Sequence, residues 1–247
     1  MELLLAGGLT FLFTTVLTVA GVGAAFILIP VFIALGIELH TAMATALLLN
    51  SIAMSIASWT FIRNRLVVWK LALPITVIAA LLSPVGVWVS RGLDRDTLLW
   101  FFAAFLVFAA LMMLFYRPKP RDAQFSTGTL LGIGGVVGGL AGFIGGLLGV
   151  GGGNIVVPAL VALGVEPKKA SASTAFIVIF ASLSGFLGHV GLSAMNSDLL
   201  LTTGVASAGG AAVGAWLMSK KLQNSQVKLV IGVVLLAIAA KIAWGLV

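Results

Sequence analysis

The stretch GVGGGNIVVP at residues 149–158 lies inside strongly apolar sequence, yet it gathers the residues that are worst at continuing a helix. Glycine permits a positive φ angle and close backbone approach. Proline lacks an N–H, and its ring clashes with the carbonyl four residues earlier. That carbonyl belongs to Asn154, the one polar side chain of the stretch. The pattern predicts a helix break in apolar surroundings, with free backbone groups beside Asn154.

The same pattern occurs earlier, as GVGAAFILIP at residues 21–30, displaced by 128 positions. The register holds through Glu38 and Glu166, and Trp88 still matches Trp216. We interpret this as an internal duplication. Residues 1–122, including the basic linker RPKPRD at 117–122, form the first repeat, and residues 123–247 form the second, within one integrated transmembrane domain.

The composition indicates a multi-span membrane protein. Hydrophobic residues make up 61% of the chain and charged residues 9%, and the mean hydropathy is +1.21, whereas soluble domains carry about 25% charged residues. About 20 apolar residues span a bilayer. We therefore expect an all-α integral membrane protein with segments near residues 3–20, 22–36, 41–62, 68–90, 97–116, 127–147, 150–164, 168–189, 199–217 and 226–246. The second and seventh segments are short for a span, and both follow a glycine break.

Other classes fit the composition poorly. The pI is near 10.3, but the Lys and Arg residues are scattered through short loops without a basic face or aromatic platform, so we expect no nucleic-acid partner. The chain has no cysteine and only 2 histidines, which argues against disulfides, thiol catalysis, a metal site or a bound cofactor. No nucleophile–base pair or carboxylate cluster lies within the apolar segments, so the sequence predicts no enzyme.

The odd number of segments in each half predicts that the two halves are inverted relative to each other. If every segment crosses the membrane, most basic residues fall on one side, which the positive-inside rule makes cytoplasmic. Both termini are then outside. Each break could instead belong to a re-entrant hairpin, and the charge pattern does not separate the two arrangements because parity is unchanged. These basic residues are Arg63, Arg65, Lys70, Arg117, Lys119, Arg121, Lys168, Lys169, Lys220, Lys221 and Lys228.

Inverted repeats with broken helices are typical of secondary transporters, whose sites lie near the bilayer midplane where the breaks meet. A helix start exposes unpaired N–H groups and about half a positive charge, so an anion is its natural ligand. All seven acidic residues fall at segment ends or in loops, which disfavours a cationic substrate. The predicted substrate-binding residues are Gly21, Gly23, Thr45, Gly151, Gly152, Gly153, Asn154, Ser171, Ser173 and Thr174, with Pro30 and Pro158 as helix-breaking residues.

Several of these residues also have plainer interpretations. Asn154 could cap the freed backbone, although its counterpart Phe26 offers only an apolar wall. The hydroxyl groups could bond to carbonyls of their own helices. Asn50, in the middle of a segment, could line the pathway or hold helices together. Glu38 and Glu166 could act as gates or cap the helix that follows. The glycines between 128 and 146 are expected to serve close helix packing.

The two copies of Gly-x-Gly-(Gly/Ala)-(Gly/Ala)-x4-Pro, each followed by Leu-Gly-(Ile/Val)-Glu and an Ala/Ser/Thr-rich helix start, resemble the TauE/SafE family of sulfite exporters. The first copy departs from the pattern at Ala24 and Ala25. The resemblance implies transport of sulfur-containing anions such as sulfite, sulfoacetate or another organosulfonate across the cytoplasmic membrane. The implied site comprises Gly151 to Asn154, with Gly21 and Gly23 opposite.

Secondary transport by alternating access is the leading hypothesis. A passive anion channel, or a transporter of a different carboxylate or oxyanion, remains the alternative. The expected partners are a small anionic substrate and the lipid bilayer, and the sequence leaves a homo-oligomer open.

Overall fold

The computed structural model describes residues 2–34, 36–37, 39–90, 95–115, 127–189 and 197–246, and this part of the chain is helical with no strand. Glu38 lies outside the described residues. Two π-helical turns, Gly134–Gly138 and Leu217–Lys221, continue the helices that precede them. The α-helices are α1 (Glu2–Ala20), α2 (Ala25–Ala34), α3 (Leu39–Arg63), α4 (Trp69–Val89), α5 (Arg95–Phe115), α6 (Thr127–Ile133), α7 (Gly139–Leu148), α8 (Gly153–Ala162), α9 (Pro167–His189), α10 (Ser197–Trp216) and α11 (Asn224–Leu246).

These helices confirm the predicted segments to within a few residues at each end, and α6, a π-helical turn and α7 together form the sixth segment. Six stretches of the described chain are long and apolar enough to cross a membrane. The protein is therefore a multi-pass integral membrane protein. In contrast, α2 and α8 have 10 residues each, or about 15 Å at 1.5 Å per residue. Neither reaches across a hydrocarbon core of about 30 Å.

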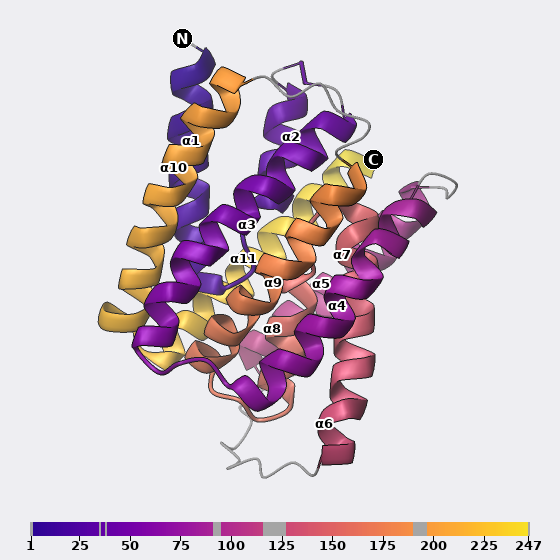
Figure 1. Ribbon diagram of the computed structural model, residues 1–247, viewed down its shortest axis with the longest axis vertical. Coiled ribbons are helices and arrows are strands. Elements are labelled where there is room, and N and C mark those ends of the chain that lie inside the picture. Colours follow the sequence, from indigo (N-terminus) through magenta and orange to yellow (C-terminus); the bar gives the residue numbers. More distant parts are fainter. Residues whose placement is uncertain are drawn as a thin grey trace.

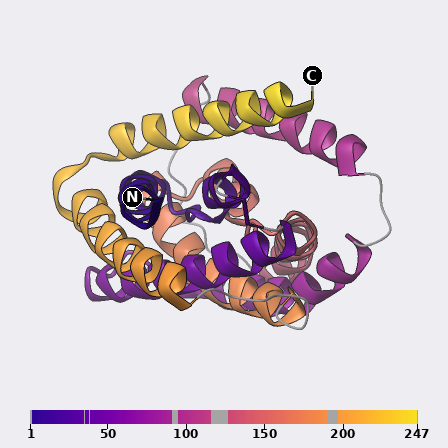
Figure 2. The ribbon, with the colours of Figure 1, turned by 90° about the horizontal axis from the view of Figure 1, so that it is seen from above.

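The helices form a layered bundle (Figures 1 and 2). Seen from above, α5 and α11 cross one side, α3, α4, α9 and α10 cover the other, and α1, α2 and α7 lie between them (Figure 2). The chain runs down α1, returns up through the short α2 and descends again in α3 (Figure 1). The start of α1 and the end of α11 both lie in the upper part of this view. Which side of the membrane they face stays a prediction.

The duplicated segments share their backbone conformation as well as their sequence. Val22 N–H donates to the Leu17 carbonyl at 3.3 Å, and Val150 N–H donates to the Gly145 carbonyl at 2.8 Å, which is the same bond 128 positions later. Three pairs of glycines at this offset all have positive φ angles, between 70° and 88°. These pairs are Gly21 with Gly149, Gly23 with Gly151, and Gly36 with Gly164.

Contacts between the halves are exchanged in the same register. A Cβ on Gly21 would lie 2.6 Å from the Cα of Ser171, and a Cβ on Gly149 would lie 3.3 Å from the Cβ of Met43. Ser171 is 128 positions after Met43, so these two residues occupy equivalent positions in the two repeats. The glycine of the first repeat therefore contacts the second repeat at the position equivalent to the one that the glycine of the second repeat contacts in the first. Ser51 donates to the carbonyl of its own counterpart, Ile179, at 3.2 Å. Such reciprocity is expected of a two-fold relation between the repeats. The inversion of the second repeat relative to the first stays a prediction.

Part of the sixth segment uses its glycines for close packing, as expected, whereas Gly128, Gly132 and Gly135 have open space around them. A Cβ on Gly142 would lie 2.3 Å from the Ala79 carbonyl oxygen of α4, and one on Gly146 would lie 2.0 Å from the Ser83 carbonyl oxygen. Only a residue without a side chain lets the two helices approach this closely. Packing of α7 on α4 positions the second break at the centre of the bundle.

Candidate functional site

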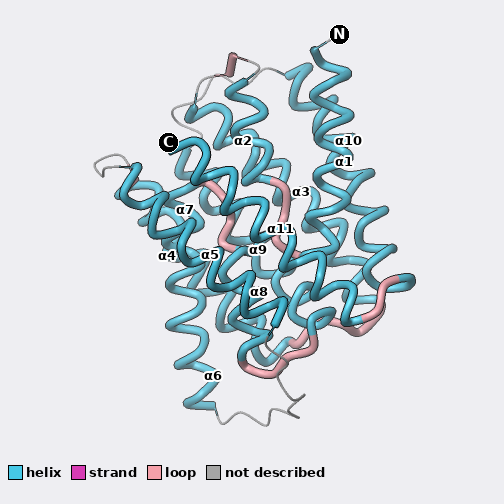
Figure 3. The backbone as a smooth tube through the Cα atoms, turned by 180° about the vertical axis from the view of Figure 1, so that it is seen from behind, coloured by secondary structure: helices cyan, strands magenta, loops and turns pink. Residues whose placement is uncertain are grey.

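The two glycine breaks meet inside the bundle. We call residues 21–24, between α1 and α2, break 1, and residues 149–152, between α7 and α8, break 2. Figure 3 shows both as loop segments surrounded by helices. A Cβ on Gly153, the first residue of α8, would lie 2.7 Å from both the Cα and the carbonyl oxygen of Val22. The start of α8 therefore rests directly against the backbone of break 1.

Break 2 is built by left-handed glycines. The φ angles are 76° at Gly151 and 74° at Gly152, a region that other residues enter only with strain. Gly152 caps α8 without any side-chain hydrogen bond, and its carbonyl accepts the first helical bonds, from Ile155 at 3.1 Å and Val156 at 3.3 Å. The N–H groups of Gly153 and Asn154 precede these bonds. They are the unpaired donors that a helix start presents.

Asn154 lies at this helix start and is 2% exposed. Its Oδ1 atom has no hydrogen-bond partner, so this oxygen does not cap the freed backbone. Most buried polar atoms in proteins are paired, and an unpaired one beside free N–H groups is the arrangement expected of a ligand site.

The four predicted hydroxyl residues play different parts. Ser171 Oγ donates to the Ala20 carbonyl at the end of α1, at 3.1 Å, so it fastens α9 to break 1 instead of bonding within its own helix. Ser173 Oγ accepts the Val68 N–H at 2.9 Å and so supports the start of α4. Thr174 is fully buried, and its Oγ1 has no partner. Thr45 is buried at 3% exposure on α3.

Thr174 lies between the two breaks along α9. Ser171 contacts Gly21 of break 1, while Val178 and Ser182 contact Gly151 of break 2. These positions fall on one helical face with Thr174, because residues three, four and seven apart share a face. Its free hydroxyl therefore lies on the face of α9 that contacts both breaks.

Asn50, for which the sequence left a pathway role and a helix-joining role open, contacts both breaks. A Cβ on Gly23 would lie 1.9 Å from Asn50 Oδ1, and one on Gly151 would lie 3.0 Å from Asn50 Nδ2. The amide thus sits between the two breaks. Nδ2 donates to Ser182 Oγ at 2.9 Å, which joins α3 to α9. Ser182 was missed, because a serine in an Ala/Ser-rich segment carries no distinctive signal.

The prolines differ from their predicted role. Pro158 lies inside α8, six residues after its capping Gly152, and Pro30 lies within the bounds of α2. The glycines alone make the breaks, because their left-handed conformation turns the chain before each proline is reached. Pro158 still has no N–H to offer the Asn154 carbonyl.

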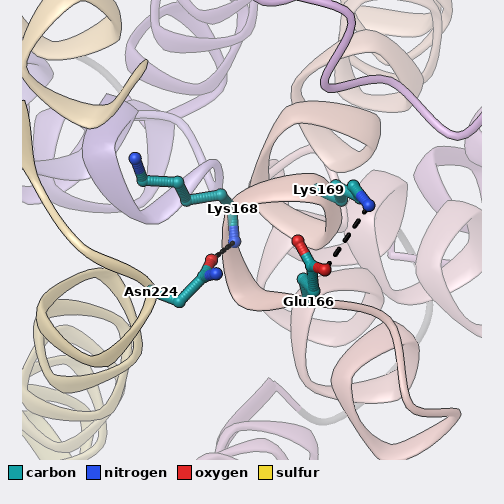
Figure 4. Close-up of polar contacts among 4 residues, drawn as sticks. All are labelled: Glu166, Lys168, Lys169 and Asn224. Atoms are coloured by element: carbon teal, nitrogen blue, oxygen red, sulfur yellow. Dashed lines mark hydrogen bonds and ion pairs between the residues drawn. The ribbon is translucent and has the colours of Figure 1, made fainter. Parts of the chain in front are cut away.

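Glu166 lies at the surface, directly before α9 (Figure 4). Its carbonyl accepts the Ala170 N–H at 2.8 Å, and its carboxylate pairs with Lys169 at 3.5 Å. The neighbouring Lys168 N–H is accepted by Asn224 Oδ1 at 3.3 Å. This is the geometry of a helix cap, and a gating role for Glu166 remains a prediction.

No ionisable group competes with a ligand at the breaks in the described part of the chain. The described Asp, Glu, Lys and Arg side chains are not buried, and no three His, Asp or Glu side chains gather there as a metal site. The polar groups buried at or beside the two breaks are the backbone donors at the start of α8, the amides of Asn50 and Asn154, and the hydroxyl of Thr174. Such a set can bind a small polar solute by hydrogen bonds and attract negative charge through the start of α8.

A bundle of membrane-spanning helices with two broken helices meeting at a buried polar centre defines a protein of the membrane transporter class. Comparison with protein families matches residues 6–242 to the family described as Sulfite exporter TauE/SafE. The match covers nearly the whole chain, so the chain belongs to this family. Comparisons with curated proteins and with solved structures found no match.

Proposed function

We propose that this protein is a secondary transporter that moves a small anion, sulfur-containing in keeping with its family, across the membrane by alternating access. The observation that carries the proposal is the start of α8, whose free N–H groups lie beside the unpaired Oδ1 of Asn154 and against break 1. A helix start attracts negative charge. The description of the family names sulfite, and the resemblance of the duplicated motif adds organosulfonates to the class of anion.

Burial of the centre favours alternating access over a passive channel. Asn50 and Thr174 are fully buried, and Asn154 is 2% exposed. An open pore would keep its lining groups in contact with water on both sides. A centre that is closed on both sides has to open to admit a substrate, and relative movement of the two repeats about the α3–α9 contact would do this.

Flux of labelled sulfite and of small sulfonates into proteoliposomes tests the proposal. We expect uptake above that of empty liposomes, saturation with concentration, and acceleration when unlabelled anion is present on the opposite side. Asn154→Leu should lower the flux at least tenfold, because it removes the amide beside the helix start. Asn64→Leu is the matched control, since Asn64 Nδ2 only donates to the Thr60 carbonyl near the end of α3.

Each alternative predicts a different result. A linear, non-saturating flux without acceleration by unlabelled anion would indicate a channel. Uptake of carboxylates without uptake of sulfite or sulfonates would show that the transported anion is a carboxylate and not a sulfur-containing anion. The assignment of the anion site would stand. Unchanged flux in Asn154→Leu would overturn the assignment of the site.

A further inference from the structure

Asn50 is a polar residue that the packing of the fold does not require. At the equivalent position of the second repeat the chain has Val178, whose Cγ1 would lie 3.4 Å from a Cβ on Gly151, just as Asn50 lies against Gly23. Similarly, Ser182 corresponds to Met54, which is fully buried. Apolar side chains thus fill the same two positions in the other half. The amide and the hydroxyl are there for a reason other than filling space.

The hydrogen bonding of Asn50 is half complete. Nδ2 donates to Ser182 Oγ at 2.9 Å, which fixes the plane of the amide. Oδ1, turned toward Gly23, has no partner although the residue is fully buried. A buried acceptor without a donor costs free energy until something supplies a hydrogen atom. The Oδ1 of Asn154 is a second acceptor in the same state.

Asn50 lies against Gly151, two residues before the start of α8, and Asn154 lies in the first turn of that helix. Two free acceptors near a helix start make an unusual anion site. The N–H groups of α8 attract negative charge, but an amide oxygen repels an anion that brings no hydrogen. Both features are satisfied together by an anion that has a hydroxyl group or a protonated oxygen. Its charged oxygens would face the N–H groups and its O–H would donate to an amide oxygen.

We propose that Asn50 Oδ1, held in place by Ser182, is a specificity-determining group that selects anions carrying their own hydrogen-bond donor. A hydroxyalkanesulfonate or a hydrogensulfite fits this description, and a fully deprotonated oxyanion does not. The inference rests on the proposed function, because it names the kind of anion that the same site takes.

A matched pair of ligands tests this without changing the protein. Ethanesulfonate and 2-hydroxyethanesulfonate have the same charge and the same sulfonate group, and they differ by one hydroxyl. We expect the purified wild-type protein, assayed by calorimetry and by competition in proteoliposomes, to bind the hydroxylated anion at least about tenfold more tightly. A site built to pair with a hydroxyl discriminates strongly against the analogue that lacks it.

Variants of Asn50 and Ser182 then test whether these residues cause the difference in affinity between the two sulfonates. Asn50→Leu, similar in size, should reduce the ratio of the two affinities to near one. Ser182→Ala should reduce it partly, because the amide loses its fixed orientation. Ser58→Ala is the control, as Ser58 is a buried residue two helical turns further along α3 and should leave the ratio unchanged.

The outcomes separate the two proposals. Equal binding of both anions by the wild-type protein, or an unchanged ratio in Asn50→Leu, overturns the role of Asn50 but leaves the anion transporter intact. Lower binding of both ligands by the same factor in Asn50→Leu would show a purely structural role and also overturn it. If neither sulfonate binds and sulfite is not transported, the proposed function fails and this inference fails with it.

Discussion

Ser173 and Thr174 are neighbours in the sequence and have opposite surroundings. Ser173 accepts a backbone N–H from the start of α4, whereas Thr174 is buried with its hydroxyl unpaired. The difference comes from the rotation of 100° between successive helical residues, which sends adjacent side chains toward different neighbours. The sequence presented them as equivalent candidates.

The pair gives a prediction in which stability and transport separate. Thr174→Val keeps the shape of the side chain and should lower anion flux at least tenfold, with a free energy of unfolding that is unchanged or slightly higher. Ser173→Ala should retain flux but lose about 1 to 2 kcal/mol of stability, because the Val68 N–H is left unpaired. Flux in proteoliposomes and thermal unfolding in detergent measure the two effects. The reverse pattern would show that Ser173 is the ligand group.

Gly152 illustrates how a structure changes the choice of a mutation. From the sequence, a bulky side chain at this position would be expected to block the site and spare the fold. In the structure, however, a Cβ on Gly152 would lie 2.3 Å from the Ala141 carbonyl oxygen, and φ is 74°. The residue supports the packing of α7 against break 2 as well as the site.

We therefore expect Gly152→Ala to destabilise the protein by more than about 2 kcal/mol, from backbone strain and the clash with a carbonyl oxygen. Gly132→Ala is the matched control. Gly132 lies in α6 with open space around its Cα, and alanine there should be neutral or stabilising by about 1 kcal/mol. Thermal unfolding of the two variants measures the contrast. Equal melting temperatures would contradict the described geometry of break 2.

At the scale of helices, the interrupted segments are the elements that make a transporter. The short α2 and α8 begin inside the bundle, so their first N–H groups are not at a surface where water could pair them. Helices α3 and α9 cross beside both breaks and carry the side chains that contact them. A ligand at the centre would touch both repeats at once.

Glu166, directly before α9, could cap that helix or act as a gate, and a substitution distinguishes the two roles. The ion pair between Glu166 and Lys169 is partly exposed, and such pairs contribute about 0 to 1 kcal/mol. If Glu166 only caps the helix, Glu166→Gln should change stability by less than about 1 kcal/mol and leave flux unaltered. A large loss of flux with normal stability, measured in proteoliposomes, would instead assign Glu166 to a gate.

At the scale of the whole molecule, the two halves contact each other through equivalent residues. If the repeats exchange these contacts, the protein passes between two conformations that are built in the same way, as alternating access requires. The predicted orientation places the α8–α9 and α10–α11 connections, with their lysines, on the cytoplasmic side. The beginning of α10 lies at the opposite end of the bundle (Figure 1).

The absence of native cysteine makes this orientation directly measurable. A single Ser225→Cys at the start of α11 should be modified by a membrane-impermeant thiol reagent only from the cytoplasmic side. Asp198→Cys at the start of α10 should be modified only from outside. Both residues are exposed. Labelling of both cysteines from the same side would contradict the predicted topology. Labelling of Ser225→Cys only from outside and of Asp198→Cys only from the cytoplasm would show that the protein does not follow the positive-inside rule.

The sequence by itself determined the class of protein, the helical segments and the two breaks. These features are local, since hydrophobic run length decides a membrane helix and glycine decides where the chain turns left-handed. The duplication followed from the same residues, because a register of 128 positions is visible without any structure. Asn154 stood out as the polar residue at a break.

Only the tertiary structure decided which polar side chains are free at the centre. Ser171, Ser173, Thr174 and Ser182 look alike in the sequence, and helix packing gives three of them partners and leaves Thr174 without one. The same packing crosses α3 over α9 and so places Asn50 between the breaks. Hydrogen-bond pairing between segments more than 100 positions apart depends on that crossing, and no local pattern encodes it.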